Sequence, residues 1–239
     1  IHYVALMHLP VTFCIDRAGL VGEDGATHHG ALDLAYMRAV PGMIVSSPRD
    51  EHSLRNLLYT TQCDNYGPFA IRYPRGSGHN PQWKNEMQKV EIGRGEKLKD
   101  GNDVAVLSLG PIAHEVSQAI KSIEETQEIS VAHYDMVFLK PIDEQILAEV
   151  AQKQVPIITV EDGAKSGGLA SAVTEWLNLH GYNSKVYPIG IPDEFIEQGT
   201  VKELYERCGM DAASISQVII RAKNENKNAT EHAEDFKNT

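Results

Sequence analysis

The chain has 239 residues, of which 42% are hydrophobic, and its 33 Asp and Glu against 22 Lys and Arg give a formal charge of −11. This hydrophobic content suffices for one large core or two moderate ones. The acidic balance argues against a nucleic-acid-binding surface, and no run approaches the ~18 apolar residues of a membrane span.

Three cysteines, Cys14, Cys63 and Cys208, lie far apart in the sequence. They are odd in number and lie in apolar or helical surroundings, which is typical of reduced thiols rather than of a disulfide framework or a metal site. We therefore expect a cytoplasmic protein.

Short apolar runs alternate with helical patterns over residues 1–78. The helix expected at 50–62 rests on Leu54, Leu57 and Leu58 at helical spacing, with Asp50 among the residues that can cap it. This alternation predicts a parallel, doubly wound α/β sheet, whose ligands bind beyond the carboxyl ends of the strands. The predicted elements are the end of a helix at 2–8, strands at 10–15, 43–48 and 69–74, and helices at 31–40 and 50–62.

A polar stretch rich in Gly, Pro, Asn and Lys follows, and we assign residues 79–94 to an interdomain linker. A second α/β unit is predicted over 95–222, with Asp143 as the N-cap of one helix. Residues 223–239 have almost no apolar side chains and are predicted to be disordered. The expected elements of the second unit are strands at 103–110, 129–139, 155–162 and 184–192, and helices around 116–123, at 144–153, at 167–182 and from Thr200.

The chain opens inside a predicted helix, without a cap or an initiator methionine. A domain that lacks its first strands exposes an unpaired sheet edge. We therefore expect this chain to be the C-terminal part of a longer polypeptide, with its first domain incomplete on the N-terminal side.

The segment "DRAGLVGEDGATHHG", residues 16–30, hangs directly off the strand predicted at 10–15. Asp24 and His28 are candidate catalytic residues, because a carboxylate near an imidazole can orient the ring and raise its basicity. The alternative is an Asx-type turn with a solvent-facing histidine. A metal site at His28 and His29 is disfavoured, because adjacent side chains do not point together.

Residues 1–78 contain six Arg and no Lys, and two of these arginines follow predicted strands. Arg17 follows the strand at 10–15, and Arg75 lies in the turn "RYPRG" after the strand at 69–74. A guanidinium grips carboxylate or phosphate in bidentate fashion, so the two arginines converge on a cleft anion if their strands are neighbours. The alternative is a pair of structural salt bridges to Asp16, Asp24 or Asp33.

Gly167 and Gly168 precede a predicted helix. Two glycines in this position can cradle a phosphate at a helix N-terminus, or they can let the helix approach a neighbour such as another subunit. The sequence leaves both interpretations open.

Six segments, in the same order over nearly all of residues 1–222, resemble the C-terminal portion of the 1-deoxy-D-xylulose-5-phosphate synthase family. They are "DRAGLVGEDGATHHGALDLAYMR", "SSPRDEHSLRNLLY", "IRYPRG", "FLKPID", "ITVEDGAKSGGLASAV" and "IGIPDEFIEQGT". In that family the thiamine-diphosphate Gly-Asp-Gly motif, the metal ligands and the activating glutamate would all lie upstream of Ile1.

The resemblance implies part of a transketolase-like pyrimidine-binding domain at 1–78 and a transketolase C-terminal domain at 95–222. It implies thiamine diphosphate and Mg²⁺ as cofactors, both requiring the upstream part of the polypeptide, with no cofactor or metal residue in this chain. The implied reaction joins pyruvate to D-glyceraldehyde 3-phosphate, and the implied assembly is a homodimer.

By similarity, Asp24 and His28 would contact the thiamine-bound intermediate and the acceptor, while Arg17 and Arg75 would hold the acceptor's phosphate. Alternatives are a transketolase, a 2-oxo-acid dehydrogenase beta subunit or a non-catalytic dimerisation module. The chain alone is expected to be inactive.

Overall fold

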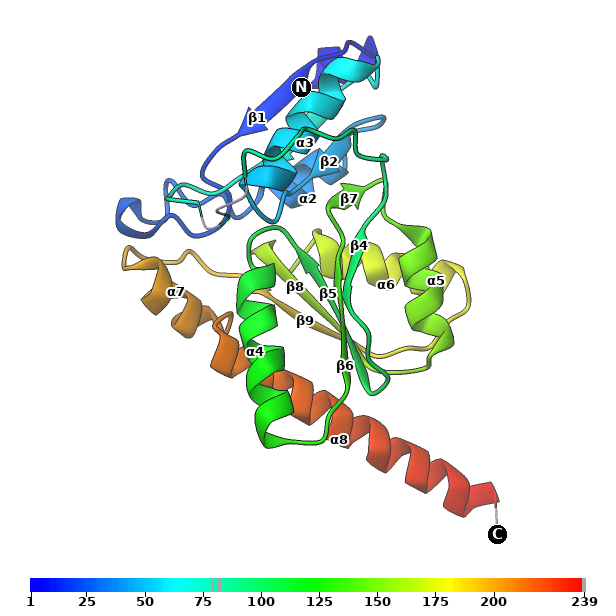
Figure 1. Ribbon diagram of the computed structural model, residues 1–239. Helices are drawn as coiled ribbons and strands as arrows, with labels where there is room; N and C mark the ends of the chain where they lie inside the picture. Colours follow the sequence, from blue (N-terminus) through cyan, green and yellow to red (C-terminus); the bar gives the residue numbers. More distant parts are fainter. Residues whose placement is uncertain (79, 81–82, 238–239) are drawn as a thin grey trace.

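The structure is a computed structural model that describes all residues except 79, 81–82 and 238–239. Its elements form two sheets, one above the other in Figure 1. The first unit contains α1 (His2–Leu6), β1 (Thr12–Ile15), the 3₁₀ helix η1 (Gly22–Asp24), α2 (Asp33–Arg38), β2 (Ile44–Ser46), α3 (Glu51–Cys63) and β3 (Phe69–Arg72). The second contains β4 (Glu96–Lys99), β5 (Val104–Leu109), α4 (Ala113–Thr126), β6 (Val131–Asp135), β7 (Phe138–Lys140), α5 (Glu144–Gln152), β8 (Ile157–Ala164), α6 (Leu169–Leu179), β9 (Val186–Ile191), α7 (Val201–Cys208) and α8 (Ala212–Lys237).

The predicted parallel pairing is confirmed in the centre of both sheets. The first sheet has the order β1-β3-β2-β7 and the second β4-β6-β5-β8-β9. Two edge strands differ from the prediction, because β7 runs antiparallel to β2 and β4 antiparallel to β6. The strand predicted at 129–139 is split at Val137, whose φ of 53° breaks the extended backbone, so that β6 and β7 join different sheets. Strand β4 was missed because its sequence, "EKLK", has no strand-like run of apolar residues.

The segment predicted as a linker is attached to α3. The backbone N–H of Val90 donates to Thr60 Oγ1 (2.8 Å), and that of Gln88 donates to Asn56 Oδ1 (3.0 Å). Val90 also packs against the apolar cluster that contains Leu57. Residues 88–90 of this segment therefore pack on the first unit, while Arg94 at its other end pairs with Asp143 of the second.

The expected disorder of residues 223–239 is not what the structure shows, because α8 continues as a helix to Lys237. Its first turns bury Ile215, Ile219 and Ala222 against the second unit, and Lys223 forms an ion pair with Asp103. A helix nucleated by this packing can extend through a polar sequence, since elongation is far easier than nucleation. Figure 1 shows the distal part of α8 leaving the body of the molecule. Residues 238–239 lie outside the described residues.

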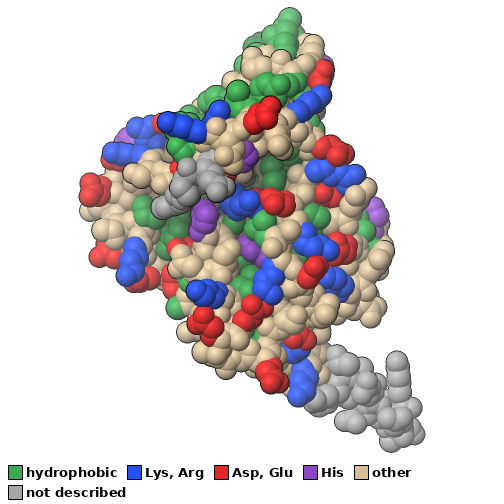
Figure 2. All heavy atoms as spheres, in the orientation of Figure 1, with side chains coloured by type: hydrophobic (Ala, Val, Ile, Leu, Met, Phe, Trp, Pro, Cys, Tyr) green, Lys and Arg blue, Asp and Glu red, His purple; other side chains and the backbone are tan. Residues whose placement is uncertain are grey.

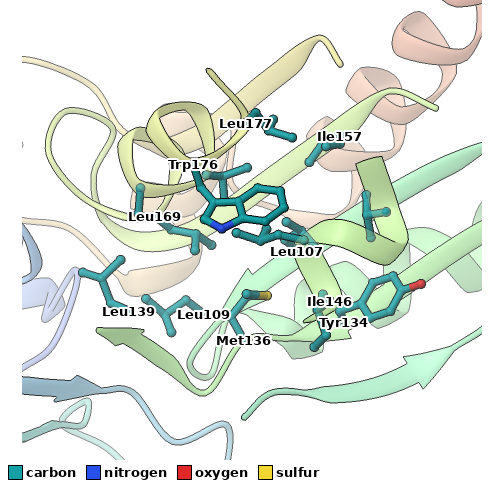
Figure 3. Packing of buried hydrophobic residues seen from close by; sticks show 14 of the residues in the cluster. Leu107, Leu109, Tyr134, Met136, Leu139, Ile146, Ile157, Leu169, Trp176 and Leu177 are labelled. Carbon is teal, nitrogen blue, oxygen red and sulfur yellow. The ribbon is translucent and has the colours of Figure 1, made fainter. Parts of the chain in front are cut away.

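One apolar core joins the two units. Leu107, Tyr134 and Trp176 belong to the second unit, and the same cluster includes Leu34 and Val45 from the first. Figure 3 shows the Trp176 ring packed over Leu107 and beside Leu169. Because these side chains are buried together, the two sheets pack as one body around the segments that connect them.

Exposed apolar side chains gather at the N-terminal end of the molecule, at the top of Figure 2. They belong to α1 and its flanks and include Tyr3, Leu6 and Met7. No helix in the described part of the chain is long and apolar enough to cross a bilayer.

The Arg72 side chain, only 1% exposed, links both units at the end of β3. Its Nε donates to Asp33 Oδ2 (2.7 Å) and its Nη2 to Asp33 Oδ1 (3.2 Å), so the pair is bidentate. Nη2 also donates to the carbonyl oxygens of Gly30 (2.9 Å) and Asp162 (2.8 Å). One guanidinium therefore connects β3, the start of α2, the 16–30 loop and β8.

The N-terminus of α6 is occupied by a side chain of the same chain. The Glu161 carboxylate accepts the backbone N–H groups of Leu169 (2.8 Å) and Ala170 (3.1 Å). An ideal Cβ on Gly168 would lie 1.9 Å from Glu161 Oε2, and one on Gly167 would lie 2.8 Å from the Cβ of Ala35 on α2. The structure thus favours the close-approach interpretation of Gly167 and Gly168, and Glu161 takes the place that a phosphate would need.

Replacing Arg72 with Met should destabilise the chain strongly. The substitution leaves the buried Asp33 carboxylate without its cation, and breaking a buried pair from one side costs about 3–5 kcal/mol. Urea unfolding at pH 7 measures the free-energy change. Arg38→Met is the matched control, because the Arg38–Glu175 pair is partly exposed and should contribute about 1 kcal/mol or less. Equal losses for the two variants would contradict this account.

Glu161→Gln should change how stability depends on pH. Burial raises the pKa of Glu161 from 4.5 to about 7, so the folded chain holds a proton that the unfolded chain has already lost between these values. The free energy of unfolding should therefore fall as pH rises from about 4.5 to about 7, by about 3 kcal/mol for this group. Gln cannot titrate, so the decline between pH 5 and pH 8 should be smaller in the variant.

Some of the decline should remain in Glu161→Gln. Burial also raises the pKa of Asp135 to about 7 and that of Asp162 to about 6, and both act in the same direction. If the free energies of unfolding of the wild type and the variant changed in parallel with pH, protonation of Glu161 would not be linked to folding.

Candidate active site at the loop between β1 and α2

The 16–30 segment forms a closed loop at the carboxyl end of β1. Its neck is a pair of backbone hydrogen bonds, from Gly19 N to Gly30 O (3.0 Å) and from Gly30 N to Gly19 O (2.9 Å). The neck is tight, since an ideal Cβ on Gly30 would lie 2.1 Å from the carbonyl oxygen of Arg17. The glycine at this position allows the loop to close on itself.

The loop and the "RYPRG" turn leave the same edge of the first sheet. Strands β1 and β3 are parallel neighbours, with Ile15 opposite Arg72. This is the neighbouring arrangement that the prediction of converging arginines requires. Arg17 follows β1 and Arg75 follows β3, so both cations belong to one end of the sheet.

Each of these arginines has a carboxylate partner. Arg75 Nη1 forms a short ion pair with Asp24 Oδ2, and Arg17 Nη1 donates to Asp16 Oδ2 at 2.7 Å. The side chains of Arg17 and Arg75 are 42% and 58% exposed. The salt-bridge alternative therefore describes their present partners, and the exposure leaves both guanidinium groups accessible to an anion.

The expected contact between Asp24 and His28 is replaced by other partners. Asp24 faces Arg75, and the exposed His28 ring places Nδ1 3.0 Å from Thr27 Oγ1. The chain turns between the two residues at Gly25, whose φ is 73°. The neighbouring guanidinium attracts the Asp24 carboxylate more strongly than a neutral imidazole does.

His29, in contrast, is built into the loop. Its Nδ1 lies 3.1 Å from the backbone N of Val21, and its Nε2 lies 3.4 Å from the carbonyl oxygen of Glu197 in the second unit. Sequence reasoning considered this histidine only as a metal ligand. Its partners lie 8 and 168 residues away in the chain, so no local signal indicates this role.

Asp162 lies against the loop at its neck, next to Gly19, with Tyr205 beside it. Tyr205 Oη donates to Asp162 Oδ2 (3.2 Å), and an ideal Cβ on Gly19 would lie 1.9 Å from that oxygen. Burial raises the pKa of Asp162 to about 6. Burial, together with Asp162, also raises the pKa of Tyr205 well above its usual value. Sequence reasoning missed both residues, and the neighbouring Arg72–Asp33 pair, because strand and helix patterns do not reveal buried polar partners.

A cleft of about 970 Å³ opens next to Arg75, between the first unit and helices α4 and α7. Its lining includes Arg75, Tyr73, His114, Asp162 and Tyr205. Arg75 therefore borders both this cleft and the 16–30 loop.

The described part of the chain holds no cluster of side chains that could together bind a metal ion. Among those residues, no group of three or more His, Cys, Asp or Glu side chains is placed to hold a metal ion.

Two family sequence models match the chain. The model described as "Transketolase, pyrimidine binding domain" matches residues 1–80, and "Transketolase, C-terminal domain" matches residues 93–215. Among solved structures, a split-gene transketolase described as an inactive beta4 tetramer superimposes with a TM-score of 0.77 at 32% identity, covering 90% of this chain and 67% of that chain. Transketolase from Leishmania mexicana has a TM-score of 0.71 at 20% identity, covering 94% and 32%, which shows a shared fold.

Curated relatives are more similar in sequence. The 1-deoxy-D-xylulose-5-phosphate synthase of Parabacteroides distasonis is 55% identical over 219 residues, which are 92% of this chain and 34% of the relative. That of Bacteroides fragilis is 52% identical over 223 residues, 93% and 34% respectively. This chain spans about a third of the length of these relatives. The chain belongs to the transketolase family, and it is similar to 1-deoxy-D-xylulose-5-phosphate synthases over that third of their length.

Proposed function

We propose that this chain is the C-terminal part of a thiamine-diphosphate-dependent enzyme that converts pyruvate and D-glyceraldehyde 3-phosphate to 1-deoxy-D-xylulose 5-phosphate and CO₂. The observation that supports the proposal is the shared sheet edge, where the 16–30 loop, which also carries His28, places Asp24 in an ion pair with Arg75. The curated relatives at 50–55% identity bear the name of this synthase, which supports the choice of reaction.

The two arginines would bind the phosphate of the acceptor. Each is paired with one exposed carboxylate in the structure, and such pairs are worth about 1 kcal/mol or less. A phosphate dianion carries more charge and offers three oxygens to the planar guanidinium forks, so it can replace these carboxylates. Binding at Arg75 would then release Asp24 from its ion pair.

His28 would exchange or stabilise a proton near the acceptor. Its ring is exposed, and imidazole is the side chain that most commonly acts as a general acid or base. Asp24 lies on the same loop and would be released from Arg75 when an anion binds there.

Thiamine diphosphate, when bound, supplies the electron sink for the decarboxylation of pyruvate. In this proposal, Mg²⁺ and the diphosphate would be held by the remainder of the polypeptide. The residues of this chain would then bind and orient the acceptor. Association of two copies in a homodimer is part of the same proposal.

Transketolase activity is the second candidate, favoured by the 32% identical split-gene transketolase. The two functions differ in their donors, because the synthase uses pyruvate whereas a transketolase takes its two-carbon unit from a sugar phosphate. Turnover of the full-length polypeptide with each donor and glyceraldehyde 3-phosphate separates them. Product formed only from the sugar-phosphate donor would overturn the synthase assignment.

Arg75→Ala, and separately Arg17→Ala, should raise the KM for glyceraldehyde 3-phosphate by roughly 10–100-fold in the full-length enzyme. Each charge-assisted hydrogen bond to the phosphate contributes about 1.5–3 kcal/mol, and about 1.4 kcal/mol corresponds to a tenfold change. Arg→Lys should recover only part of the loss, because lysine lacks the planar fork. Unphosphorylated glyceraldehyde is the control, since the wild type should use it poorly and the variants no worse. Equal losses with both acceptors would make these arginines structural.

His28→Ala should lower kcat by roughly 10²–10⁴-fold, the usual contribution of a positioned proton-transfer group. Asp24→Asn should cost less, because it keeps the shape of the side chain and removes only its charge. Steady-state kinetics with saturating pyruvate and acceptor measures both effects. A His28→Ala enzyme with a near-normal kcat would reduce this part of the loop to a structural turn.

A further inference from the structure

The candidate catalytic loop is held from outside by a short segment of the second unit, Glu197–Gly199. Gly199 N donates to Gly22 O (3.4 Å), and an ideal Cβ on Gly25 would lie 3.5 Å from the Cβ of Gln198. The third contact is made by His29, whose Nε2 faces the carbonyl oxygen of Glu197. These contacts flank η1, the turn that contains Asp24.

The two partners of His29 determine where its proton resides. The backbone N–H of Val21 can only donate, so Nδ1 must accept and carries no hydrogen. The carbonyl of Glu197 can only accept, so Nε2 must carry the hydrogen. The neutral Nε2–H tautomer alone satisfies both hydrogen bonds.

We propose that His29 is a positioning residue for the candidate active site, acting as a tautomer-specific bridge between Val21 in the loop and Glu197 in the second unit. Val21 directly precedes η1 and His29 directly follows His28, so the bridge sets the positions of the turn that carries Asp24 and of the His28 backbone. The effect of the bridge on the candidate active site rests on the proposed function, whereas the existence of the hydrogen-bonded bridge does not.

This role separates the two adjacent histidines. His28 is exposed and its ring hydrogen-bonds to the neighbouring Thr27 side chain, whereas His29 is partly buried between two loops. It also gives the second unit a role in the site, although none of the four candidate site residues belongs to that unit. The second unit contributes a fixed carbonyl oxygen and a fixed N–H group at Glu197–Gly199.

Three substitutions distinguish the two hydrogen bonds. In His29→Asn the amide oxygen can take the place of Nδ1 and accept from Val21. In His29→Gln the longer side chain places its amide near Nε2, within reach of Glu197. His29→Leu retains bulk and loses both bonds.

The first readout uses this chain and does not depend on enzyme activity. The ¹⁵N chemical shifts of His29 should show the Nε2–H tautomer. Exchange of the Val21 amide hydrogen should be roughly tenfold faster in His29→Leu and His29→Gln and close to wild type in His29→Asn, because one hydrogen bond is lost or kept. His28→Leu is the matched control for exchange and should leave Val21 protected.

The second readout uses the full-length enzyme. His29→Leu should lower kcat roughly tenfold with little change in the KM for pyruvate, and His29→Asn should recover most of it. An Nδ1–H tautomer, or unchanged Val21 exchange in His29→Leu, would overturn the bridge. A normal kcat in His29→Leu would overturn the positioning role and leave the bridge with a role in stability only. If the full-length enzyme lacks synthase activity, the proposed function fails, while the tautomer and the exchange data still decide whether the bridge exists.

Discussion

The buried guanidinium of Arg72 is the interaction on which the arrangement of the candidate site depends. It pairs with Asp33 at the start of α2 and donates to carbonyl oxygens of Gly30 and Asp162. Removing a charge from water costs several kcal/mol unless its partners are all in place. The positions of the loop neck, of α2 and of β8 are therefore linked, because a shift of the second unit would remove the hydrogen bond from Arg72 to the Asp162 carbonyl oxygen.

The charges at the surface of the site behave in the opposite way. Arg17 and Arg75 are partly exposed, and each pairs with a single carboxylate. Exchange of such a partner for a dianion costs little, since solvent screens both states. The molecule thus combines a rigid internal ion pair, which holds the loop, with exchangeable ion pairs at the place where an anionic acceptor would bind.

The second unit contributes to the site through its backbone and its buried acids. Asp162 lies against Gly19 at the loop neck and accepts from Tyr205, while the Glu197 carbonyl faces His29. Burial raises the pKa of Asp162 and of Glu161, so ionising these groups in the folded chain is unfavourable. Asp162 lies where the second unit meets the loop, and Glu161 lies where it meets α2. The structure thus tolerates the unfavourable burial of a carboxyl group at both contacts.

Local sequence signals determined much of the fold. Apolar periodicity identified the central strands and the helices, and the caps of α3 and α5 at Asp50 and Asp143 form as predicted, because a cap contacts residues two or three positions away. The sequence also predicted that Arg17 and Arg75 each lie beyond the carboxyl end of a strand, but only the structure shows that these two strands are neighbours.

Tertiary structure alone decided which groups meet across the chain. The partner of Asp24 is 51 residues away, those of Arg72 are up to 90 residues away, and the Glu197 partner of His29 is 168 residues away. The same holds for the polar strand β4, which is stabilised by pairing with β6, and for α8, whose polar end continues a helix packed on α4. Hydrogen bonds and ion pairs between distant segments form only after packing has brought those segments together, so periodicity and spacing carry no record of them.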